Sequence, residues 1–337
     1  MAFHFSTRRS VIGRRTFILG SSISLLGLRF PANAQSTAKL PRIGFLGATS
    51  EAGFGQHIDA FRSGLRDLGY VDGKTCIIYY RWAEDDYARL PTIAAELVAL
   101  HVDVLVTHGT PGTRAAQRAT STIPIVMMTS GDAVGSGIVT SLSRPGGNIT
   151  GSTFFVPEIT AKRLELLKEA LPTVKRVAFL VNPDNPSIRP TLKTMDSTAT
   201  AQKMELQIIE ARRSVEIEHA FSTMAKTGAD AFVILDDRML VDNAKEIAAL
   251  AAANRLPGAG PREFADAGGL IAYAVDFSNL YRRAAVFIDK ILKGTKPSDI
   301  PVEQATRFET VINLKTAKAL SLTIPQSLLL RADAVIR

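Results

Sequence analysis

Short apolar runs rich in β-branched residues alternate along the chain with longer segments that have helical spacing. The runs of the first half lie at residues 43–46, 77–80, 104–106 and 125–128. Residues 54–68, between the first two runs, carry apolar side chains every three or four positions, which places them on one face of a helix. Residues 90–100 repeat this spacing before the third run. Strands that alternate with such helices predict a parallel sheet with helices on both faces.

The second half of the chain repeats this order of elements at an offset of about 120 to 135 residues. Its apolar runs lie at residues 175–180, 205–209, 229–235, 256–258 and 270–273, and the last corresponds to residues 148–151 of the first half. Two unrelated α/β domains would show a similar alternation, but the identical order in both halves favours two related lobes. We therefore predict an α/β fold of two similar, doubly wound parallel-sheet lobes joined by a hinge.

The boundaries of the two lobes follow from the apolar face of a late helix. Residues 281–292 have helical spacing and follow the second set of runs, so this helix can return to the first lobe. We expect the N-terminal lobe to comprise residues 40–153 and about 277–300. The C-terminal lobe then comprises residues 154–276 and about 301–337. Because ligands of open α/β sheets bind beyond the carboxyl ends of the strands, two such lobes predict a ligand cleft between them.

The first 34 residues differ in composition from the rest of the chain. They contain five arginines, which include the pair Arg14 and Arg15, and no acidic residue. An apolar stretch at 17–28, too short to span a bilayer, is followed by small residues at 32–34 that are typical of a cleavage site. This pattern predicts a twin-arginine export signal that is removed near Ala34, with an ordinary secretory signal as the alternative. We therefore expect a periplasmic protein.

Much of the positive charge belongs to this leader. Without its five arginines, the 40 basic residues fall to 35 against 32 acidic residues, and the formal charge falls from +8 to +3. A charge this small removes most of the support for a nucleic-acid partner. Cys76 is the only cysteine, so an intrachain disulfide is excluded.

Motifs for nucleotide, dinucleotide, hydrolase and zinc chemistry are absent or incomplete. Residues 69–75 are one residue short of a phosphate-binding loop and precede a strand instead of following it. Residues 53–55 lack the third glycine of a dinucleotide fingerprint, because Ile58 stands in its place. No G-x-S-x-G occurs, and the five histidines and one cysteine lack metal-ligand spacing. We predict no catalytic residue, no cofactor and no metal ligand, and therefore no enzyme.

The loops that follow the predicted strands are rich in small hydrogen-bonding residues. Residues 110–113 stand before a helix expected to begin near Arg114, where hydroxyls and free amides can bind an anionic group such as a carboxylate. Carboxylates in the corresponding loops of the second half, at 236–237 and Asp276, can bind an amine. The pattern favours a zwitterion such as an amino acid, with helix capping as the alternative role of each residue, including the pair at 85–86.

Two stretches near the middle of the chain resemble a family signature. Residues 132–139 read D-A-V-G-S-G-I-V, and residues 141–151 read S-L-S-R-P-G-G-N-I-T-G. With supporting stretches at 64–74, 123–126 and 311–317, they resemble ABC-transporter substrate-binding proteins of the tryptophan/tyrosine uptake type, over roughly residues 41–329. The resemblance implies a type I periplasmic binding fold, two lobes hinged by three crossovers, and ligand capture by closure. It also implies delivery of the ligand to an ABC permease driven by a separate ATPase. We expect the chain to be a monomer.

The resemblance also implies, by position along the chain, that nine residues belong to the loops that bind the ligand. These are Ser50, Thr110, Pro111, Gly112, Ser130, Asp132, Asn182, Asp236 and Asp276. Residues 49–55 and 236–240 lack the side chains expected of an aromatic amino-acid binder, so the expected ligand is an amino acid or a similar small polar solute. Two other functions stay open: an exported enzyme with Asp236 or Asp276 as an acid–base group in the cleft, and a ligand-sensing partner of a membrane receptor.

Overall fold

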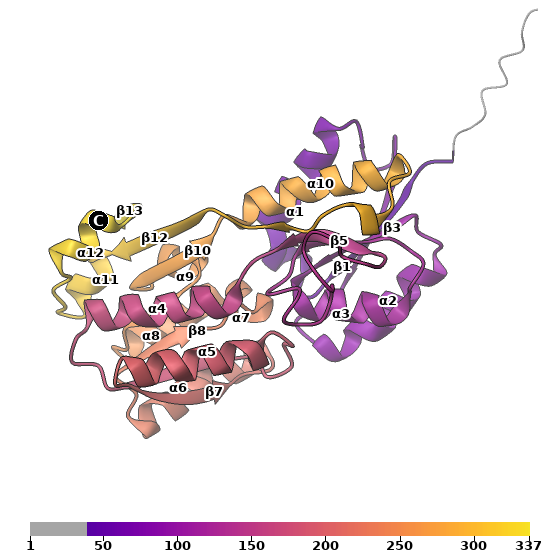
Figure 1. Cartoon of the computed structure of the whole chain (residues 1–337). Coiled ribbons are helices and arrows are strands. Elements are labelled where there is room, and N and C mark those ends of the chain that lie inside the picture. The colour runs from indigo at the N-terminus through magenta and orange to yellow at the C-terminus, as the bar shows by residue number, and fades with distance from the viewer. Residues whose placement is uncertain (1–38) are drawn as a thin grey trace, which may run out of the picture. The chain divides into compact units, whose positions relative to one another are not determined.

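Two β-sheets, each covered by helices on both faces, organise residues 39–337, which a computed structural model describes apart from the side chain of Gln56 (Figure 1). The predicted export signal at 1–34 lies outside the described residues. None of the helices within residues 39–337 is both long enough and apolar enough to cross a membrane.

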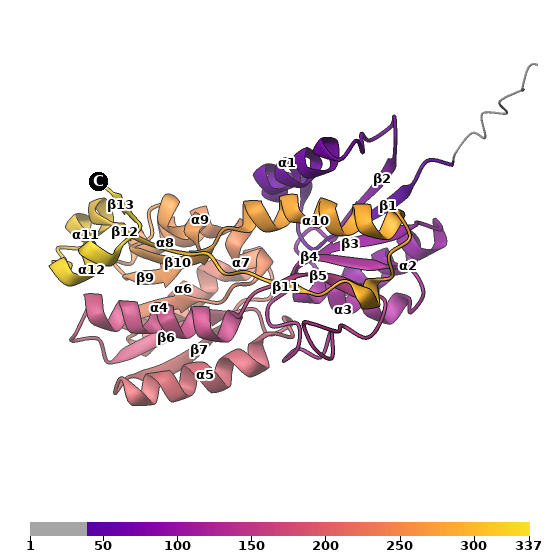
Figure 2. The same cartoon turned by 45° about the horizontal axis from the view of Figure 1, so that its top comes forward.

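The first sheet has six strands in the order β11-β5-β4-β3-β1-β2, and all its neighbouring strands are parallel. The strands are β1 (Arg42–Gly47), β2 (Ile77–Trp82), β3 (Val104–His108), β4 (Ile125–Thr129), β5 (Ile149–Thr153) and β11 (Glu303–Gln304). Helices α1 (Glu51–Asp67) and α10 (Phe277–Leu292) pack against each other on one face, and α2 (Leu90–Ala99) and α3 (Gly109–Ala119) pack together on the other (Figure 2).

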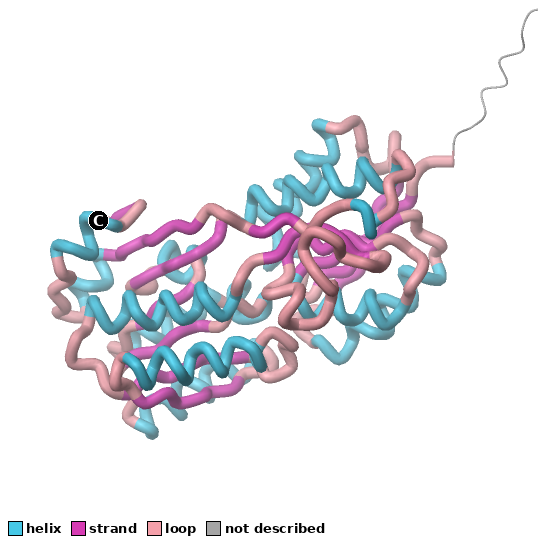
Figure 3. The backbone as a smooth tube through the Cα atoms, in the orientation of Figure 1, coloured by secondary structure: helices cyan, strands magenta, loops and turns pink. Residues whose placement is uncertain are grey.

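The second sheet has seven strands in the order β13-β12-β10-β9-β8-β6-β7. The strands are β6 (Arg176–Val181), β7 (Glu205–Glu210), β8 (Ala231–Ile234), β9 (Gly258–Gly260), β10 (Ile271–Val275), β12 (Phe308–Asn313) and β13 (Ala334–Ile336). Helices α4 (Val156–Ala170) and α5 (Ile188–Ala201) pack against each other, as Figure 3 shows in cyan. The remaining helices are α6 (Ile217–Thr227), α7 (Arg238–Asp242), α8 (Ala244–Ala253), α9 (Arg262–Asp266), α11 (Leu314–Ala319) and α12 (Gln326–Arg331).

The repeat predicted from the sequence is present in the strand order. The first sheet contains β5-β4-β3-β1-β2, and the second contains the corresponding strands as β10-β9-β8-β6-β7. The predicted α/β fold with two similar, doubly wound sheets is therefore confirmed.

The late strands differ from the expectation in two ways. We expect residues from about 301 to 337 in the second lobe, but β11 at 303–304 pairs with β5 in the first sheet. The second sheet is also mixed, because β12 runs antiparallel to β10. Phe308 at the start of β12 lies opposite Val275 at the end of β10. The chain thus enters the second sheet at the carboxyl end of its parallel strands, and this entry point dictates the antiparallel direction.

Alternate residues of the central strands face opposite helical layers. On β1, Ile43 and Phe45 pack in one apolar cluster with Phe54 of α1, whereas Leu46 packs in a second cluster with Leu97 of α2. All five side chains are buried. A strand buried on both faces needs a continuous apolar sequence, which explains the unbroken apolar runs of the sequence.

The chain passes between the two sheets three times, at 153–156, 275–277 and 304–308. Each passage follows the carboxyl end of a strand of one sheet, namely β5, β10 and β11. The loops after the parallel strands of both sheets therefore lie close to these three passages, at the place where open α/β sheets bind ligands.

Helices α1 and α10 approach each other closely at a glycine. A Cβ atom at Gly64 would lie 2.3 Å from the backbone oxygen of Arg282, a distance that no side chain tolerates. In contrast, a Cβ atom at Gly55 of the same helix would meet nothing within 4 Å among the described residues.

We predict opposite effects of alanine at these two glycines. Gly64→Ala should lower the free energy of unfolding by about 1–3 kcal/mol, because it forces α1 away from α10. Gly55→Ala should raise it by up to about 1 kcal/mol, because alanine is the better helix former. Urea denaturation of both variants measures the difference, and an equal effect of the two substitutions would contradict this packing.

Candidate functional site

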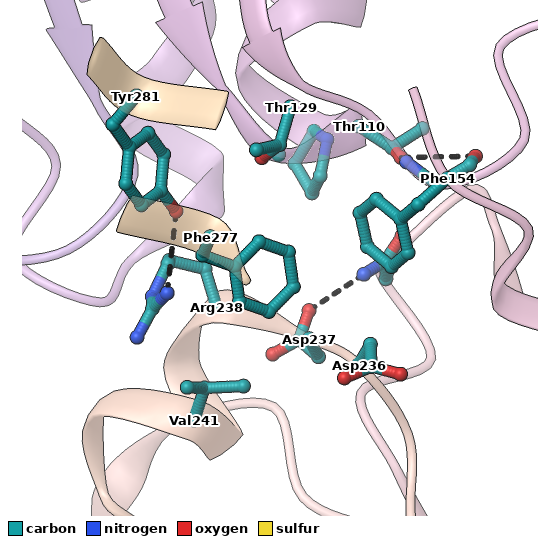
Figure 4. A pocket seen from close by; sticks show the side chains of 13 residues that line it. Thr110, Thr129, Phe154, Asp236, Asp237, Arg238, Val241, Phe277 and Tyr281 are labelled. Carbon is teal, nitrogen blue, oxygen red and sulfur yellow. Dashed lines mark hydrogen bonds between the residues drawn. The ribbon is translucent and has the colours of Figure 1, made fainter. Parts of the chain in front are cut away.

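A small, partly open pocket lies where the strands of both sheets end (Figure 4). The first sheet and α10 contribute Gly109, Thr110, Pro111, Thr129, Gly131, Phe277 and Tyr281. The second sheet contributes Asn185, Asp236, Asp237, Arg238 and Val241, and the passage from β5 to α4 contributes Phe154. The pocket therefore combines two walls that come from different halves of the repeat.

The wall from the first sheet presents the N-terminus of α3. The helix follows β3 directly, because Gly109 has a φ of 75° that allows the sharp turn, and Pro111 fits the first turn of a helix. It begins five residues earlier than the expected start near Arg114, so Thr110 and Gly112 belong to its first turn. Among the described residues, no side chain caps this helix. Its first free amides and the positive end of its dipole can therefore bind an anionic group.

The hydroxyl of Thr110 ties this helix to the loop after β4. Its Oγ1 accepts a hydrogen bond from the amide of Gly131 at 3.0 Å and lies 3.3 Å from Oγ of Ser130. His108, just before the helix, accepts a hydrogen bond from the amide of Ala48 at Nε2. Burial lowers the pKa of His108 well below its ordinary value, and Arg238 lowers it further, so the imidazole is neutral at neutral pH.

The opposite wall presents the carboxylate of Asp236, just after β8. Its Oδ1 accepts a hydrogen bond from Nη2 of Arg163 at 2.9 Å, and its Oδ2 lies 2.8 Å from Nη1. Arg163 of α4 is fully buried and also donates to the carbonyls of Tyr273 and Ile234. Burial raises the pKa of Asp236, and the guanidinium of Arg163 opposes the rise. Oδ2 has no well-aligned donor among the described residues, so it can accept a hydrogen bond from a ligand.

Asp237, the next residue, has a different role from Asp236. Its Oδ2 accepts hydrogen bonds from Asn185 Nδ2 at 2.8 Å and from Tyr87 Oη at 2.9 Å, and its Oδ1 caps α7 at the amide of Leu240. The predicted capping role of this residue is thus confirmed. Burial raises the pKa of Asp237, although all these donors oppose the rise. Its oxygens are occupied within the protein and serve to hold the loop.

Aromatic side chains form much of the remaining surface. The rings of Phe154 and Phe277 lie edge to face with centroids 5.2 Å apart, and Phe277 and Tyr281 follow each other along α10 at 6.2 Å. Figure 4 shows the hydroxyl of Tyr281 directed at Arg238, with which it forms a hydrogen bond of 3.4 Å. Arg238 in turn pairs with Asp242. The pocket therefore has apolar sides and polar ends, as ligand pockets commonly do.

Beside the pocket, Asp85 enters a group of acidic residues from the second sheet. Both Glu84 and Asp85 have a left-handed backbone, with φ values of 54° and 62°. Burial raises the pKa of Asp85 to about 6, the carboxylates of Asp242, Glu84 and Asp237 raise it further, and Arg238 opposes the rise. Its Oδ1 is buried and has no hydrogen-bond partner among the described residues. Ionised Asp85 is therefore unfavourable in the folded chain.

The structure brings three of the nine predicted ligand-binding residues together in this pocket, namely Thr110, Pro111 and Asp236. Gly112 of α3 and Ser130, whose Oγ lies 3.3 Å from Oγ1 of Thr110, are buried and do not line the pocket. The other four have local hydrogen-bonding roles. Ser50 caps α1, Asp132 accepts from the amide of Gly135, Asn182 accepts from the amide of Asp184, and Asp276 caps α10. Contact with a ligand stays a prediction for all nine.

Several lining residues were missed by the sequence analysis, and most of them gave no local signal. Phe277 and Tyr281 belong to a helix whose apolar spacing indicated only a packing face. Thr129 ends a strand, and Val241 lies in the five-residue helix α7. Asn185 and Arg238 lie in the loops after strands that we expect to hold the ligand, at 182–185 and 236–238, although they are not among the nine candidates. Within residues 39–337, no group of three or more His, Cys, Asp or Glu is placed to hold a metal ion.

Comparisons with known proteins agree with this architecture. The family model described as ABC transporter substrate binding protein matches residues 43–336. A tyrosine-binding protein of Clostridioides difficile is 28% identical over 263 residues, which cover 78% of this chain and 75% of that protein. The resemblance read from residues 132–151 is thereby confirmed.

Two solved structures are similar over nearly the whole described chain. An ABC domain from Streptococcus pneumonia in complex with L-Trp has a TM-score of 0.80 and 26% identity, and covers 88% of this chain and 100% of that one. A conserved domain protein from Vibrio cholerae has a TM-score of 0.82 and 27% identity, with the same coverage. The two-lobed fold expected from the resemblance is confirmed.

We predict that Asp85→Asn makes the protein more stable at neutral pH. The folded pKa of Asp85 is about 6 against an ordinary value of 3.8, so the folded chain holds this proton more tightly than the unfolded chain. That stabilisation is complete below about pH 4 and is lost as the pH rises through 6. Asparagine, which keeps the left-handed backbone, should raise the free energy of unfolding by about 1 kcal/mol above pH 7, after allowance for solvent screening.

Thermal denaturation from about pH 4.5 to 8 tests this prediction. The exposed neighbour Glu84, which shares the left-handed backbone, supplies the control variant Glu84→Gln. The gain of Asp85→Asn should shrink steadily from pH 8 toward pH 4.5 and be absent from the control. A gain of equal size at every pH would contradict the assignment.

Proposed function

The chain belongs to the family of ABC transporter substrate binding proteins, and from this premise we propose that it captures an amino acid with an aromatic side chain. It delivers this ligand to a membrane permease that a separate ATPase drives. The predicted export signal supports action in the periplasm. A relative described as a tyrosine-binding protein and a similar structure in complex with L-Trp support the ligand class.

One observation carries the proposal: an anion site and a carboxylate face the same pocket from opposite walls. The free amides of α3 and the hydroxyl of Thr110 lie on the first wall, and Asp236 Oδ2 lies on the second. The α-carboxylate of an amino acid binds at the N-terminus of α3, where amides and dipole favour negative charge. Its α-ammonium binds at Asp236, which accepts a charge-assisted hydrogen bond.

The aromatic residues of the pocket determine which side chain the ligand carries. Phe154, Phe277 and Tyr281 offer ring faces and edges, and Val241 and Pro111 add apolar surface. Aromatic pairs gain about 0.5–1.5 kcal/mol beyond the burial of their area, so a ring in the ligand binds better here than an aliphatic chain of similar size. This proposal departs from the expectation drawn from residues 49–55 and 236–240, because the rings of the pocket come from α10 and from the passage after β5.

Capture follows from the division of the site between the two sheets. The carboxylate of the ligand belongs to the first wall and its ammonium to the second, so only the closed arrangement satisfies both groups. A ligand with contacts to both walls shifts the population toward the closed state. We propose that each sheet and its helices move as one lobe about the three passages between them.

We predict that the mature chain binds L-tryptophan or L-tyrosine and requires both charged groups of the ligand. Isothermal titration calorimetry should show that tryptamine or tyramine, which lack the carboxylate, bind at least about 100-fold more weakly. The same loss is expected for indole-3-propionate or 3-(4-hydroxyphenyl)propionate, which lack the ammonium. The D-enantiomers, which exchange the positions of the groups, should also bind weakly.

Recovery of the ligand after binding separates a receptor from an enzyme. The bound amino acid should be released unchanged when the complex is denatured, as mass spectrometry can show. Equal affinity for an amino acid and its decarboxylated analogue would refute the role of α3. A chemically altered product would refute the receptor.

A further inference from the structure

Tyr87 reaches from the layers of the first sheet to the loop that carries Asp236. It begins η1 (Tyr87–Arg89), the single turn that precedes α2. Its Oη donates a hydrogen bond to Asp237 Oδ2 at 2.9 Å and accepts one from the amide of Met239 at 3.3 Å. Both partners belong to the start of α7, so one phenol hydroxyl contacts the carboxylate cap and the first turn of the same helix.

The backbone around Tyr87 holds the phenol in this position. The side chain of Asp86 accepts a hydrogen bond from the amide of Ala88, which caps the turn at 3.0 Å. Arg89 Nη1 donates to the carbonyl of Ala83 at 3.2 Å across the same turn. These bonds close a short loop between β2 and α2, so Tyr87 is oriented by contacts within the first half of the chain.

The partner of Tyr87 stands next to the residue that we assign to the ammonium of the ligand. Asp236 and Asp237 are adjacent, and their carboxylates serve different groups. Asp236 pairs with Arg163 behind it and lines the pocket, whereas Asp237 bonds Tyr87 across the gap between the two walls. Asn185 and the amide of Leu240 keep Asp237 in place on its own side.

We propose that Tyr87 is a positioning residue that latches the closed cleft through Asp237 and so sets the affinity for the ligand. The effect on ligand affinity rests on the proposed function. The latch, by which we mean the two hydrogen bonds of Tyr87 Oη with Asp237 and Met239, does not depend on any ligand. The hydrogen bonds of Tyr87 Oη form only when the two walls meet, so they stabilise the closed state over the open one. The bound ligand and the hydrogen bonds of Tyr87 both favour the closed state. Ligand binding therefore stabilises these hydrogen bonds, and the hydrogen bonds raise the affinity for the ligand.

A second tyrosine–aspartate pair provides a matched control. Tyr70, in the loop after α1, donates from its Oη to Asp289 Oδ1 of α10 at 3.0 Å, and both helices pack on the first sheet. Tyr70→Phe and Tyr87→Phe each remove one hydroxyl that donates to a carboxylate and keep the ring. They differ in whether that bond crosses from one wall of the cleft to the other.

The experiment measures affinity and amide exchange in both variants. In calorimetry with L-tryptophan and L-tyrosine, Tyr87→Phe should bind about tenfold more weakly than the wild-type chain, and Tyr70→Phe should bind as the wild type does. Hydrogen–deuterium exchange without ligand should become several-fold faster at residues 238–240 in Tyr87→Phe, because the amide of Met239 loses its acceptor. Thermal unfolding of the two variants shows whether both stay folded.

The outcomes separate the latch from the proposed function. Weaker binding together with faster exchange in Tyr87→Phe alone supports the proposal. Unchanged affinity in Tyr87→Phe, or an equal loss in both variants, overturns it, since neither result links closure to this bond. If the wild-type chain binds neither amino acid, the proposed function fails, and unchanged exchange at 238–240 would then overturn the latch as well.

Discussion

The buried ion pair between Arg163 and Asp236 is the contact on which the rest of the pocket depends. A fully buried guanidinium is tolerated only when its charge is paired and its donors are used, and Arg163 bonds Asp236, Tyr273 and Ile234. Asp236 follows β8, Ile234 ends β8 and Tyr273 lies in the middle of β10, so Arg163 ties α4 to these two strands. Removal of either charge would leave the other buried and unpaired, at a cost of about 3–5 kcal/mol.

Loops from the two sheets form the two walls of the site beside this ion pair. Both sheets have the same strand order and present the loops after their strands near the three passages of the chain. The first sheet supplies the start of α3 and the second supplies Asp236 and α7, so opposite partial charges face each other. The hydrogen bond of Tyr87 to Asp237 and that of Arg238 to Tyr281 also join the two walls, at the start of α7. The same few loops therefore carry the groups that bind the ligand and the hydrogen bonds that hold the two walls together.

Much of the fold could be predicted from the sequence because local periodicity encodes it. The runs of β1 to β10 and the helical spacing of α1, α2 and α10 gave the repeat and the return of the last long helix. The antiparallel direction of β12 escaped prediction because it depends on where the chain crosses between sheets. The site was harder to predict because its contacts join residues that are distant in the sequence. Arg163 and Asp236 are 73 positions apart, and Tyr87 and Asp237 are 150 apart. Ser50 and Asp276 show a further limit, because the same oxygens can cap a helix or bind a ligand.

A crystal structure of the mature chain with a bound aromatic amino acid would show whether the two walls hold the two charged groups of the ligand. The α-carboxylate should lie within hydrogen-bond distance of the free amides at the N-terminus of α3, and the α-ammonium should lie at Oδ2 of Asp236. The ring of the ligand should then lie against Phe154 and Phe277. A ligand with its charged groups reversed, or one bound outside the pocket between the two walls, would contradict the central claim.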